Sequence, residues 1–327
     1  MVKIAIIGAG FSGLSAAHLL KNDADITLFE KARGVGGRMS TRRATPYFFD
    51  HGAQYFTVCT QPFQSFIQPL IDQNIIKRWD PRYINFDDKE IIERKNWSEE
   101  NPRYVGVPGM NMVAKHLAKD FNFHINTKIT SLHKKGKWQL TDDQGQQYLN
   151  FDWVISSVPS PQLVDLMPEN FKYKQHINTI KMHPCFSLML GFEKKFPLEF
   201  EAAHITNSDL SWIGVNSHKP ERANLFTLII HSSEKYAKNH INHAHEEVMG
   251  HLVAETSRII GYNLKNVDYK ALHLWRYTNT HTRGSSKIFL DYDNKIGACG
   301  DWCVGGRVEG AFTSAYNLAN KMKEYGL

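Results

Sequence analysis

Short apolar runs separated by polar turns dominate the start of the chain. Residues 3–7 (Lys-Ile-Ala-Ile-Ile) form a short, mostly apolar run rich in β-branched isoleucine, which is typical of a strand buried in a parallel sheet. Residues 26–29 repeat the pattern, and residues 14–20 between them are apolar enough for a buried helix. We therefore expect a strand–helix–strand unit at the N-terminus.

The middle of the chain alternates between helical and strand patterns. Apolar side chains in residues 62–76 recur at helical spacing and predict an amphipathic helix, whereas the polar and aromatic residues 79–97 predict a hairpin. A helix start is expected at Pro108, and residues 234–260 predict one long helix. Further strands are expected at residues 123–125, 128–132, 138–140, 148–151, 152–159, 185–192, 224–231 and 272–277.

The glycine-rich turn after the first strand has the spacing of a dinucleotide site. Gly8 allows a tight turn, Gly10 lets the backbone approach a pyrophosphate, and Gly13 lets the next helix pack closely on the strand. The N–H groups that open this helix suit the phosphates. The candidate binding residues here are Gly8, Ala9, Gly10, Phe11, Ser12 and Gly13.

Glu30 ends the second strand, where a carboxylate is expected to bind the ribose hydroxyls of the dinucleotide. An acidic residue at this position argues against the 2′-phosphate of NADP. The pattern so far does not separate FAD from NAD. Lys31, a further candidate cofactor contact, follows, and then a second glycine loop, Gly34-Val-Gly-Gly-Arg38.

The segment Phe29–Arg38 resembles the signature of the glutathione-reductase-type flavoproteins, in particular the amine oxidase superfamily. By this resemblance, Gly36 and Gly37 wrap the pyrophosphate and Arg38 adds a charge-assisted contact. NAD-only dehydrogenases have no reason to place a Gly-Gly-Arg loop directly after the ribose acid. The resemblance therefore implies FAD.

The residues that follow narrow the resemblance to the renalase-like flavoproteins, which share the patterns GGRMSTRR and DHGAQYFT. In the superfamily the second stretch runs beneath the isoalloxazine ring, so the resemblance implies that Gln54 and Tyr55 lie at the flavin and shape its wall. A strand with alternating polar and buried residues is the alternative interpretation. The implied contacts in this part are Met39, Gly52, Ala53, Gln54 and Tyr55.

A second glycine-rich segment lies near the C-terminus. Residues 295–301 predict a last parallel strand that ends in Gly300-Asp301, and a helix is expected over residues 312–323. The resemblance implies that Asp301 holds a ribityl hydroxyl and that the helix N-terminus stabilises the anionic reduced flavin. It also places the backbone of Ile129 at the adenine. The implied contacts are Ile129, Gly300, Asp301, Val308, Glu309, Gly310 and Ala311.

The chain of 327 residues is long enough for two lobes with separate cores. The resemblance covers essentially the whole chain. It implies an α/β fold of the amine oxidase two-domain type, in which a Rossmann-like FAD-binding domain carries an inserted substrate domain of mixed sheet and helices. The expected FAD-binding domain comprises residues 1–57, 102–165 and 287–327, and the expected substrate domain comprises residues 58–101 and 166–286.

Composition changes this picture little. Hydrophobic (42%) and charged (22%) contents are ordinary for a soluble enzyme, and no apolar run reaches the ~18–20 residues of a membrane span. No secretory signal precedes the first strand, so a cytoplasmic location is expected. The net charge of +6 is too dispersed to indicate nucleic acid, but it suits an anionic ligand.

The cysteines and histidines give no sign of a metal. The cysteines form no CxxC pair and are expected to be reduced thiols: Cys59, Cys185, Cys299 and Cys303. On a continuous helix, His251 would lie roughly 12 Å beyond His243, too far to share one ion. A solvated helix face is therefore the preferred interpretation of His240, His243, His245 and His251.

The resemblance implies a bacterial renalase-like oxidase. That family oxidises the 2- and 6-dihydro isomers of NAD(P) to NAD(P)+ by hydride transfer to flavin N5, and O2 then reoxidises the flavin and gives H2O2. The role is repair of metabolites that inhibit dehydrogenases. The absence of a cysteine motif for covalent attachment predicts non-covalent FAD. The expected partners are an anionic dinucleotide and O2, with no nucleic acid or membrane, and the chain is expected to be a monomer or weak dimer.

The substrate side carries weaker signals. Trp275, Arg276 and Tyr277 are candidates to line it, and Arg283 and Lys287 are candidates to meet phosphates. A buried aromatic strand explains Trp275 and Tyr277 about as well, and a solvated basic loop explains the last two residues better. Two other functions stay open: an amine oxidase or desaturase-like enzyme on the same fold, and a non-catalytic FAD-binding sensor.

Overall fold

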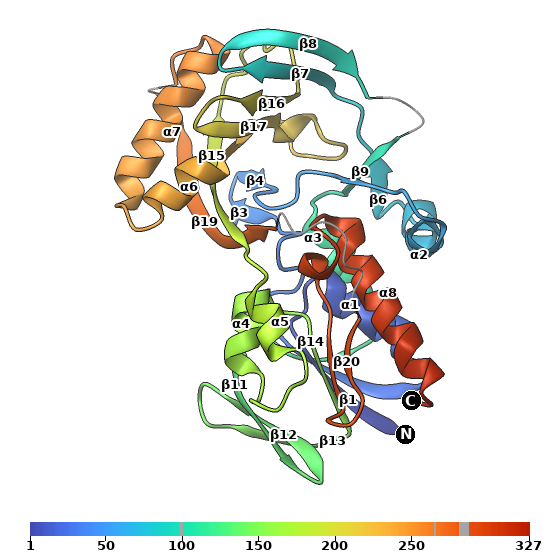
Figure 1. Cartoon of the computed structure of the whole chain (residues 1–327). Coiled ribbons are helices and arrows are strands. Elements are labelled where there is room, and N and C mark those ends of the chain that lie inside the picture. Colours follow the sequence, from blue (N-terminus) through green and yellow to red (C-terminus); the bar gives the residue numbers. More distant parts are fainter. Residues whose placement is uncertain (98–100, 265, 281–287) are drawn as a thin grey trace. The chain divides into compact units, whose positions relative to one another are not determined.

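The computed structural model describes residues 1–97, 101–264, 266–280 and 288–327, so Arg283 and Lys287 lie outside the described residues. The chain folds into two compact units, each built from separate stretches of sequence (Figure 1). Unit 1 comprises Met1–Gly37, Ala114–Met182 and Asn279–Leu327. Unit 2 comprises Arg38–Val113 and His183–Thr278.

Unit 1 is built on a six-stranded sheet with the strand order β10-β2-β1-β14-β21-β20. Neighbours from β10 to β21 are parallel, and β20 is antiparallel to β21. The inner strands are almost fully buried, as parallel strands covered on both faces must be. The strands are β1 (Val2–Ile7), β2 (Ala24–Phe29), β10 (Asn122–His124), β14 (Trp153–Ser156), β20 (Phe289–Asp291) and β21 (Ile296–Ala298).

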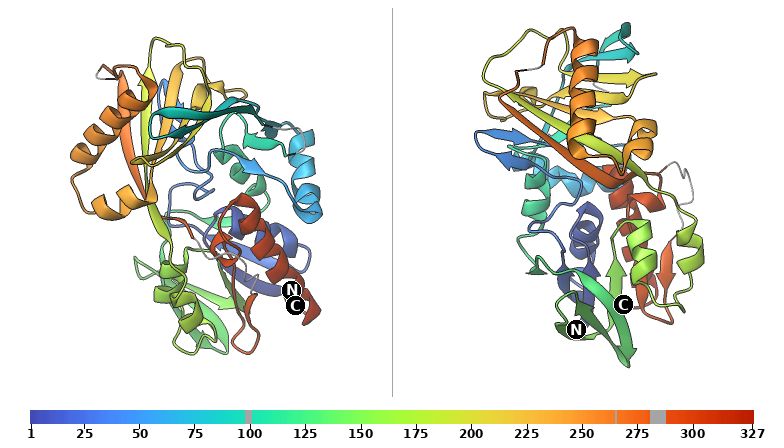
Figure 2. Two further views of the ribbon diagram at one scale, coloured as in Figure 1. Left: turned by 45° about the horizontal axis from the view of Figure 1, so that its top comes forward. Right: turned by 90° about the vertical axis from the view of Figure 1, so that its left-hand side faces the viewer.

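Helices and a small antiparallel sheet cover the six-stranded sheet. Helices α1 (Phe11–Leu20) and α8 (Val308–Glu324) pack against each other and against the strands (Figure 2). Alternate side chains of β1, such as Ile7, share a core with Trp138 and Leu140 of the antiparallel sheet. That sheet and the nearby helices are β11 (Ile129–Lys135), β12 (Lys137–Asp142), β13 (Gln147–Phe151), α4 (Ser160–Leu166) and α5 (Lys174–Asn178).

Unit 2 is built on a mixed seven-stranded sheet with the order β19-β15-β18-β17-β16-β7-β8. Helices α6 (Glu234–His240) and α7 (His245–Ile260) pack on one face of it and share its larger core (Figure 2). The strands are β7 (Arg82–Asp87), β8 (Glu90–Asn96), β15 (His183–Phe192), β16 (Ala202–Thr206), β17 (Leu210–Val215), β18 (Phe226–Ser232) and β19 (Tyr269–Asn279).

Smaller elements carry the connections of unit 2. Strands β3 and β4 form a hairpin, and β5, β9 and β6 form a three-stranded sheet. A short 3-10 turn, Asn216–His218, follows β17. The bounds are β3 (Arg42–Ala44), β4 (Tyr47–Phe49), β5 (Phe56–Thr57), β6 (Ile76–Arg78), β9 (Arg103–Gly106), α2 (Gln61–Asp72) and α3 (Asn111–Leu117), the last crossing into unit 1.

The expected hairpin in residues 79–97 is confirmed as β7 and β8. The single long helix expected over residues 234–260 is wrong, because α6 ends at His240 and α7 begins at His245. The His243 N–H bonds the His240 carbonyl in a turn between the two helices, in a run rich in asparagine and histidine, which are mediocre helix formers. The helix expected over residues 62–76 ends earlier, at Asp72, before Asn74 takes a left-handed φ of 56°.

The compact units divide the chain differently from the expected domains. Residues 38–57 and 102–113 lie in unit 2, and residues 166–182 lie in unit 1. The first two stretches are tied to the later part of unit 2 because Asp50 bonds both Met110 and Arg222. The expected domains were defined by which residues contact the cofactor, whereas the units are defined by compactness. The expected domain bounds therefore stay a prediction.

No helix in the described ranges is long and apolar enough to cross a membrane. The four cysteines are free thiols. The search for three or more metal-ligating side chains in suitable geometry finds no group among the residues with described positions.

Candidate functional site

In unit 1 the glycine-rich turn joins β1 to α1 at the carboxyl end of the parallel strands. Gly8 has a φ of 100°, and its N–H bonds the carbonyl of Phe29 at 2.8 Å. A methyl group added at Gly13 would lie 2.1 Å from the Gly8 carbonyl oxygen, so only glycine allows this approach of helix to strand. At Gly10, by contrast, an added methyl would meet nothing within 4 Å. The space beside the Gly10 backbone is therefore open.

Glu30 lies directly behind this turn. It is 7% exposed, and its carboxylate accepts hydrogen bonds from the N–H groups of Ala9 (2.9 Å) and Ala32 (2.8 Å). Each carboxylate oxygen retains capacity for a further hydrogen bond from a hydroxyl. The second glycine loop returns alongside the first, since the Gly36 N–H bonds the Ala9 carbonyl at 2.8 Å. The structure thus brings the acid and both glycine loops together.

The C-terminal motif joins the same site within unit 1. The Ser314 hydroxyl of α8 accepts a hydrogen bond from the Gly300 N–H at 2.9 Å and lies 3.4 Å from the Ser12 hydroxyl of α1. The carbonyl of Asp301 accepts from the N–H groups of the turn that follows it, Val304, Gly305 and Gly306. Residues Val308, Glu309, Gly310 and Ala311 form the first turn of α8.

Two expected contacts of unit 1 lie further out. Lys31 is exposed, and its ammonium donates to the Gln162 side chain at 3.3 Å. Ile129 is 7% exposed at the start of β11, and its side chain belongs to the core with Trp138. Only the backbone of Ile129 is therefore available to the adenine contact that the resemblance implies.

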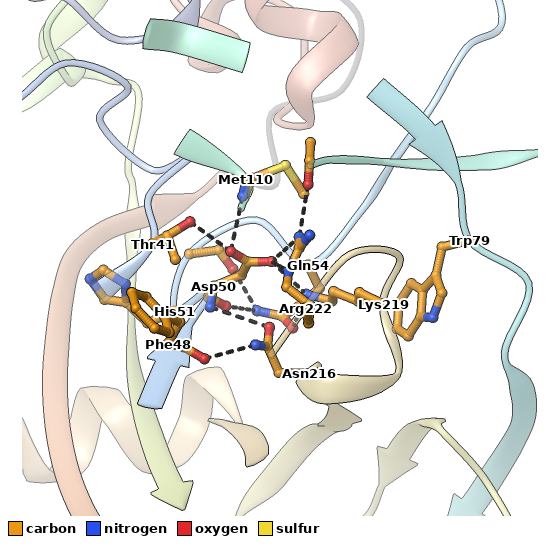
Figure 3. Close-up of polar contacts among 12 residues, drawn as sticks. Thr41, Phe48, Asp50, His51, Gln54, Trp79, Met110, Asn216, Lys219 and Arg222 are labelled. Atoms are coloured by element: carbon orange, nitrogen blue, oxygen red, sulfur yellow. Dashed lines mark hydrogen bonds and ion pairs between the residues drawn. The ribbon is translucent and has the colours of Figure 1, made fainter. Parts of the chain in front are cut away.

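The densest polar cluster of unit 2 surrounds the carboxylate of Asp50 (Figure 3). Asp50 is 0% exposed and accepts from the Thr41 hydroxyl (2.7 Å) and the Met110 N–H (3.0 Å) through one oxygen. The other oxygen accepts from the Lys219 ammonium (3.3 Å) and from two nitrogens of the Arg222 guanidinium (2.6 and 3.3 Å). The side chains of both cations are also buried, at 0% and 2% exposure.

The charges in this cluster do not cancel. Burial acts to raise the pKa of Asp50, but Lys219 and Arg222 outweigh it and hold that pKa at about 2. Burial lowers the pKa of Lys219 to about 8, because Asp50 only partly offsets the loss of water and Arg222 adds to it. At neutral pH two cations thus face one carboxylate, and the cluster holds a surplus positive charge.

The loop after Asp50 contains the residues expected at the flavin. The Gln54 amide nitrogen donates to the carbonyls of Asp50 (2.6 Å) and Gly52 (3.1 Å), and its oxygen accepts from Lys219 at 3.2 Å. The Ala53 N–H bonds the Arg38 carbonyl at 2.8 Å. A methyl group at Gly52 would lie 1.9 Å from that carbonyl oxygen. Within unit 2 the structure brings these expected residues together. Met39, which follows Arg38 in the chain, is buried.

The side chains of Arg38 and Tyr55 have definite surroundings in unit 2. One guanidinium nitrogen of Arg38 donates to the Thr278 carbonyl at 2.7 Å. The Tyr55 ring lies 4.8 Å from the ring of Trp97 and 5.7 Å from that of Trp212, measured between centroids. Tyr55 is thus part of an aromatic cluster.

A row of polar side chains crosses the sheet of unit 2. Ser187, His231 and Trp212 are direct cross-strand neighbours on β15, β18 and β17. The Ser187 hydroxyl and the Trp212 indole N–H are buried without a hydrogen-bond partner in the part of the chain that the structure describes. Buried polar groups are nearly always paired, so both atoms suit hydrogen bonds to a bound molecule.

Imidazoles flank this row. The His231 Nε2 lies 3.5 Å from the Gln54 amide nitrogen, and burial lowers the pKa of His231 and of His51 to about 4. The Trp275 indole stacks on His51 at 5.2 Å and donates to its carbonyl at 2.8 Å. Both imidazoles are therefore neutral at pH 7.

The run Trp275-Arg276-Tyr277 is divided by the alternation of its strand. Trp275 and Tyr277 are half-buried on one face of β19, whereas Arg276 is exposed and points the other way. Trp275 and Tyr277 stay candidates for a ligand wall. Arg276 does not share their face, and its place at the substrate stays a prediction.

Residues 89–322 match the family of flavin containing amine oxidoreductases, and residues 6–70 match the NAD(P)-binding Rossmann-like domain. Because the first match covers well over half of the chain, this protein belongs to the flavin containing amine oxidoreductase family. It is a flavin-dependent oxidoreductase, as the resemblance implied.

Individual relatives agree with this membership. Renalase of Mus musculus is 21% identical over 354 residues, covering 99% of this chain and 100% of renalase. A 4,4′-diapophytoene desaturase of Staphylococcus aureus (strain MRSA252) is 35% identical over 78 residues, covering 20% of this chain and 16% of the desaturase. The expected renalase-like character is confirmed at this level.

Solved structures confirm the expected fold. An oxidoreductase from Methanosarcina mazei superposes with a TM-score of 0.72 at 13% identity, covering 98% of this chain and 100% of that protein. A putrescine oxidase variant superposes with a TM-score of 0.72 at 12% identity, covering 99% of this chain and 100% of the oxidase. At such low identity the likeness establishes the two-domain amine oxidase fold alone.

The two central glycines of the turn should separate folding from ligand binding. Gly13→Ala should destabilise the protein by at least about 2 kcal/mol, because its methyl group would collide with backbone. Gly10→Ala should leave the unfolding free energy of the apoprotein within about 0.5 kcal/mol of the wild-type value, because its methyl group meets no protein atom within 4 Å. It should weaken FAD binding at least about tenfold, because the methyl group occupies space expected for the pyrophosphate. Urea unfolding and flavin fluorescence titration measure the two quantities. Equal FAD affinity in Gly10→Ala and wild type would contradict the site.

Asp50→Asn should be among the most damaging conservative changes in unit 2. It leaves two buried cations without a carboxylate, so we expect a loss of about 3–5 kcal/mol in the free energy of unfolding. Asp80→Asn is the matched control, since Asp80 forms an exposed ion pair with Arg78 and should cost under about 1 kcal/mol. Similar unfolding midpoints in urea for the two variants would refute the role assigned to Asp50.

The buried imidazoles predict a specific acid sensitivity. The pKa of His231 falls from 6.5 to about 4 on folding, so the unfolded chain takes up the proton first as the pH drops. The stabilising contribution is complete above pH 6.5 and is lost between pH 6.5 and 4, amounting to roughly 3 kcal/mol. His231→Gln should flatten the pH dependence of urea unfolding in this window, whereas exposed His133→Gln should not. An unchanged slope in His231→Gln would rule the explanation out.

Proposed function

We propose that this protein is a flavin-dependent oxidase that takes hydride from a 2- or 6-dihydro isomer of NAD(P) and delivers the electrons to O2, giving NAD(P)+ and H2O2. The observation that carries the proposal is the charge of the unit 2 cluster. Asp50 is outnumbered by Lys219 and Arg222, and no other carboxylate in the described ranges bonds either cation. A surplus positive charge beside neutral imidazoles favours an anionic or neutral substrate over a protonated amine.

FAD is the cofactor that we assign to unit 1. Glu30 offers oxygens to ribose hydroxyls, and the open space at Gly10 before the α1 N-terminus suits a pyrophosphate. Burial raises the pKa of Cys299 to about 12, so this nearby thiol is a poor nucleophile, which supports non-covalent binding. When bound, a flavin supplies hydride acceptance at N5 and electron transfer to O2.

The protein's own contribution is position and electrostatics. Residues Gly52 and Ala53 are held against the Arg38 backbone, so this loop presents a fixed surface to the ring that the resemblance assigns to it. The indole N–H of Trp212 and the hydroxyl of Ser187 have no hydrogen-bond partner among the described residues and are suited to the carboxamide of a dihydronicotinamide. Tyr55, Trp275 and Tyr277 provide aromatic surface for a planar substrate ring.

The aromatic cluster also favours a second candidate function. The rings of Tyr55, Trp97 and Trp212 lie within 6 Å of one another in two pairs, at 4.8 and 5.7 Å. Such rings attract cations, which would suit an amine substrate. Protein cations already lie at these rings, because Arg103 is 4.8 Å from the Trp97 ring. The Trp79 ring, whose centroid is 5.4 Å from that of Trp97, likewise has Lys219 at 5.4 Å. This competition makes the amine the weaker candidate.

Anaerobic visible spectra distinguish the two functions. We expect the 2- or 6-dihydro isomers of NAD to bleach the oxidised flavin band of the purified holoprotein within the mixing time of a manual experiment, whereas putrescine and benzylamine leave it unchanged. Readmission of O2 should restore the band with formation of H2O2. Bleaching by the amines but not by the dihydronicotinamides would establish the second candidate. A flavin that responds to neither would favour a sensor.

A further inference from the structure

We propose that Lys219 is a positioning residue: it holds the Gln54 amide, and through that amide the backbone of residues 50–55, in the geometry that a ligand meets. The inference rests on the proposed function only in assigning this loop to the ligand. The contacts that carry it lie entirely within unit 2 (Figure 3).

Lys219 is not needed to neutralise Asp50. Arg222 alone places two nitrogens on the same carboxylate oxygen, and it is itself fixed by the carbonyls of Gly106 (2.8 Å) and Pro220 (2.9 Å). The other oxygen of Asp50 accepts hydrogen bonds from the Thr41 hydroxyl and the Met110 N–H. Adding a second fully buried cation to a carboxylate already satisfied in this way costs desolvation energy that one shared ion pair does not recover. A purely structural role therefore gives a poor account of Lys219.

The distinct partner of Lys219 is Gln54. Its ammonium lies 3.2 Å from the Gln54 amide oxygen, and it is the one donor that the described residues give to that oxygen. The amide nitrogen meanwhile donates to two backbone carbonyls of the loop, those of Asp50 and Gly52. The Gln54 side chain thus clamps the turn that precedes it, and Lys219 fixes the far end of the clamp.

The orientation of the clamp follows from the partners. A reversed amide would set its oxygen against two carbonyl oxygens and its nitrogen against the ammonium, so all three contacts select the same orientation. With Gln54 only 6% exposed, loss of the ammonium leaves its oxygen buried and unpaired. The turn formed by residues 50–54 should then sample other conformations, in which the Gln54 amide oxygen accepts from other donors.

Besides Asp50 and Gln54, the Trp79 ring lies against the Lys219 ammonium. The ammonium lies 5.4 Å from the centre of the Trp79 ring, whose indole N–H donates to His218 at 3.2 Å. The charged and titratable groups that act on it electrostatically are Asp50, Arg222 and His231. None of them offers a donor to the Gln54 oxygen, so none can replace Lys219 in the clamp.

Hydrogen exchange tests the inference without flavin or substrate. In full-length Lys219→Met, we expect backbone amides in the peptide covering residues 50–55 to exchange at least about tenfold faster than in wild type. The melting temperature should stay within about 2 °C of wild type or rise, because the change removes a surplus buried charge and keeps the Asp50–Arg222 pair. Lys235→Met removes one exposed lysine of α6 and controls for net charge.

A double-mutant cycle establishes whether Lys219 acts through Gln54. In a Gln54→Leu background, Lys219→Met should add no further exchange in residues 50–55, because the acceptor is already gone. Wild-type exchange in Lys219→Met, or the same acceleration in both backgrounds, would overturn the inference. A melting temperature more than about 5 °C lower, or failure to fold, would also overturn it, since Lys219 would then be structural. Each result is independent of whether dihydronicotinamides reduce the flavin.

Discussion

The buried carboxylate of Asp50 is the interaction on which unit 2 depends. It is one anion shared by donors from three separated stretches of sequence, including Thr41, Met110 and Arg222. Because a buried charge tolerates no missing partner, these stretches have one mutual arrangement at low energy. Asp50 therefore also fixes where the loop with Gly52 and Ala53 begins. This loop lies so close to the Arg38 backbone that Gly52 has no room for a side chain.

In unit 1 backbone contacts, rather than charge, set the geometry. The first helix begins at Phe11, and its Gly13 lies so close to the Gly8 carbonyl that a side chain has no room there. The hydroxyl of Ser314 links the last helix to Gly300. The same Ser314 hydroxyl lies 3.4 Å from the Ser12 hydroxyl of the first helix, so segments from opposite ends of the chain meet at the carboxyl ends of the parallel strands. That edge is where open α/β sheets bind dinucleotides, so the fold by itself places the glycine turn where we propose that the pyrophosphate binds.

The sequence predicted unit 1 far better than unit 2. The reason is the distance along the sequence between the residues that form each site. The glycine spacing and Glu30 are local signals whose geometry follows from one strand–turn–helix unit. Lys219 and Arg222, in contrast, lie in a Lys-Pro-Glu-Arg run typical of a solvated turn, and their partner Asp50 is far away in sequence. The pattern did single out Gln54, but it could not predict which groups its amide bonds, because one of them, Lys219, is far away in sequence. The break at residue 241 between α6 and α7 was missed because weak helix formers decide it only in the folded context.

The proposed reaction passes hydride from a dihydronicotinamide to the flavin of this protein. Anaerobic stopped-flow reduction with the 6-dihydro isomer, carrying either two hydrogens or two deuterium atoms at C6, tests this step directly. We expect flavin bleaching to be slower with deuterium, because the bond from C6 to the transferred atom breaks as the flavin is reduced. Bleaching at one rate with both isotopes would contradict hydride transfer as the reaction of this site.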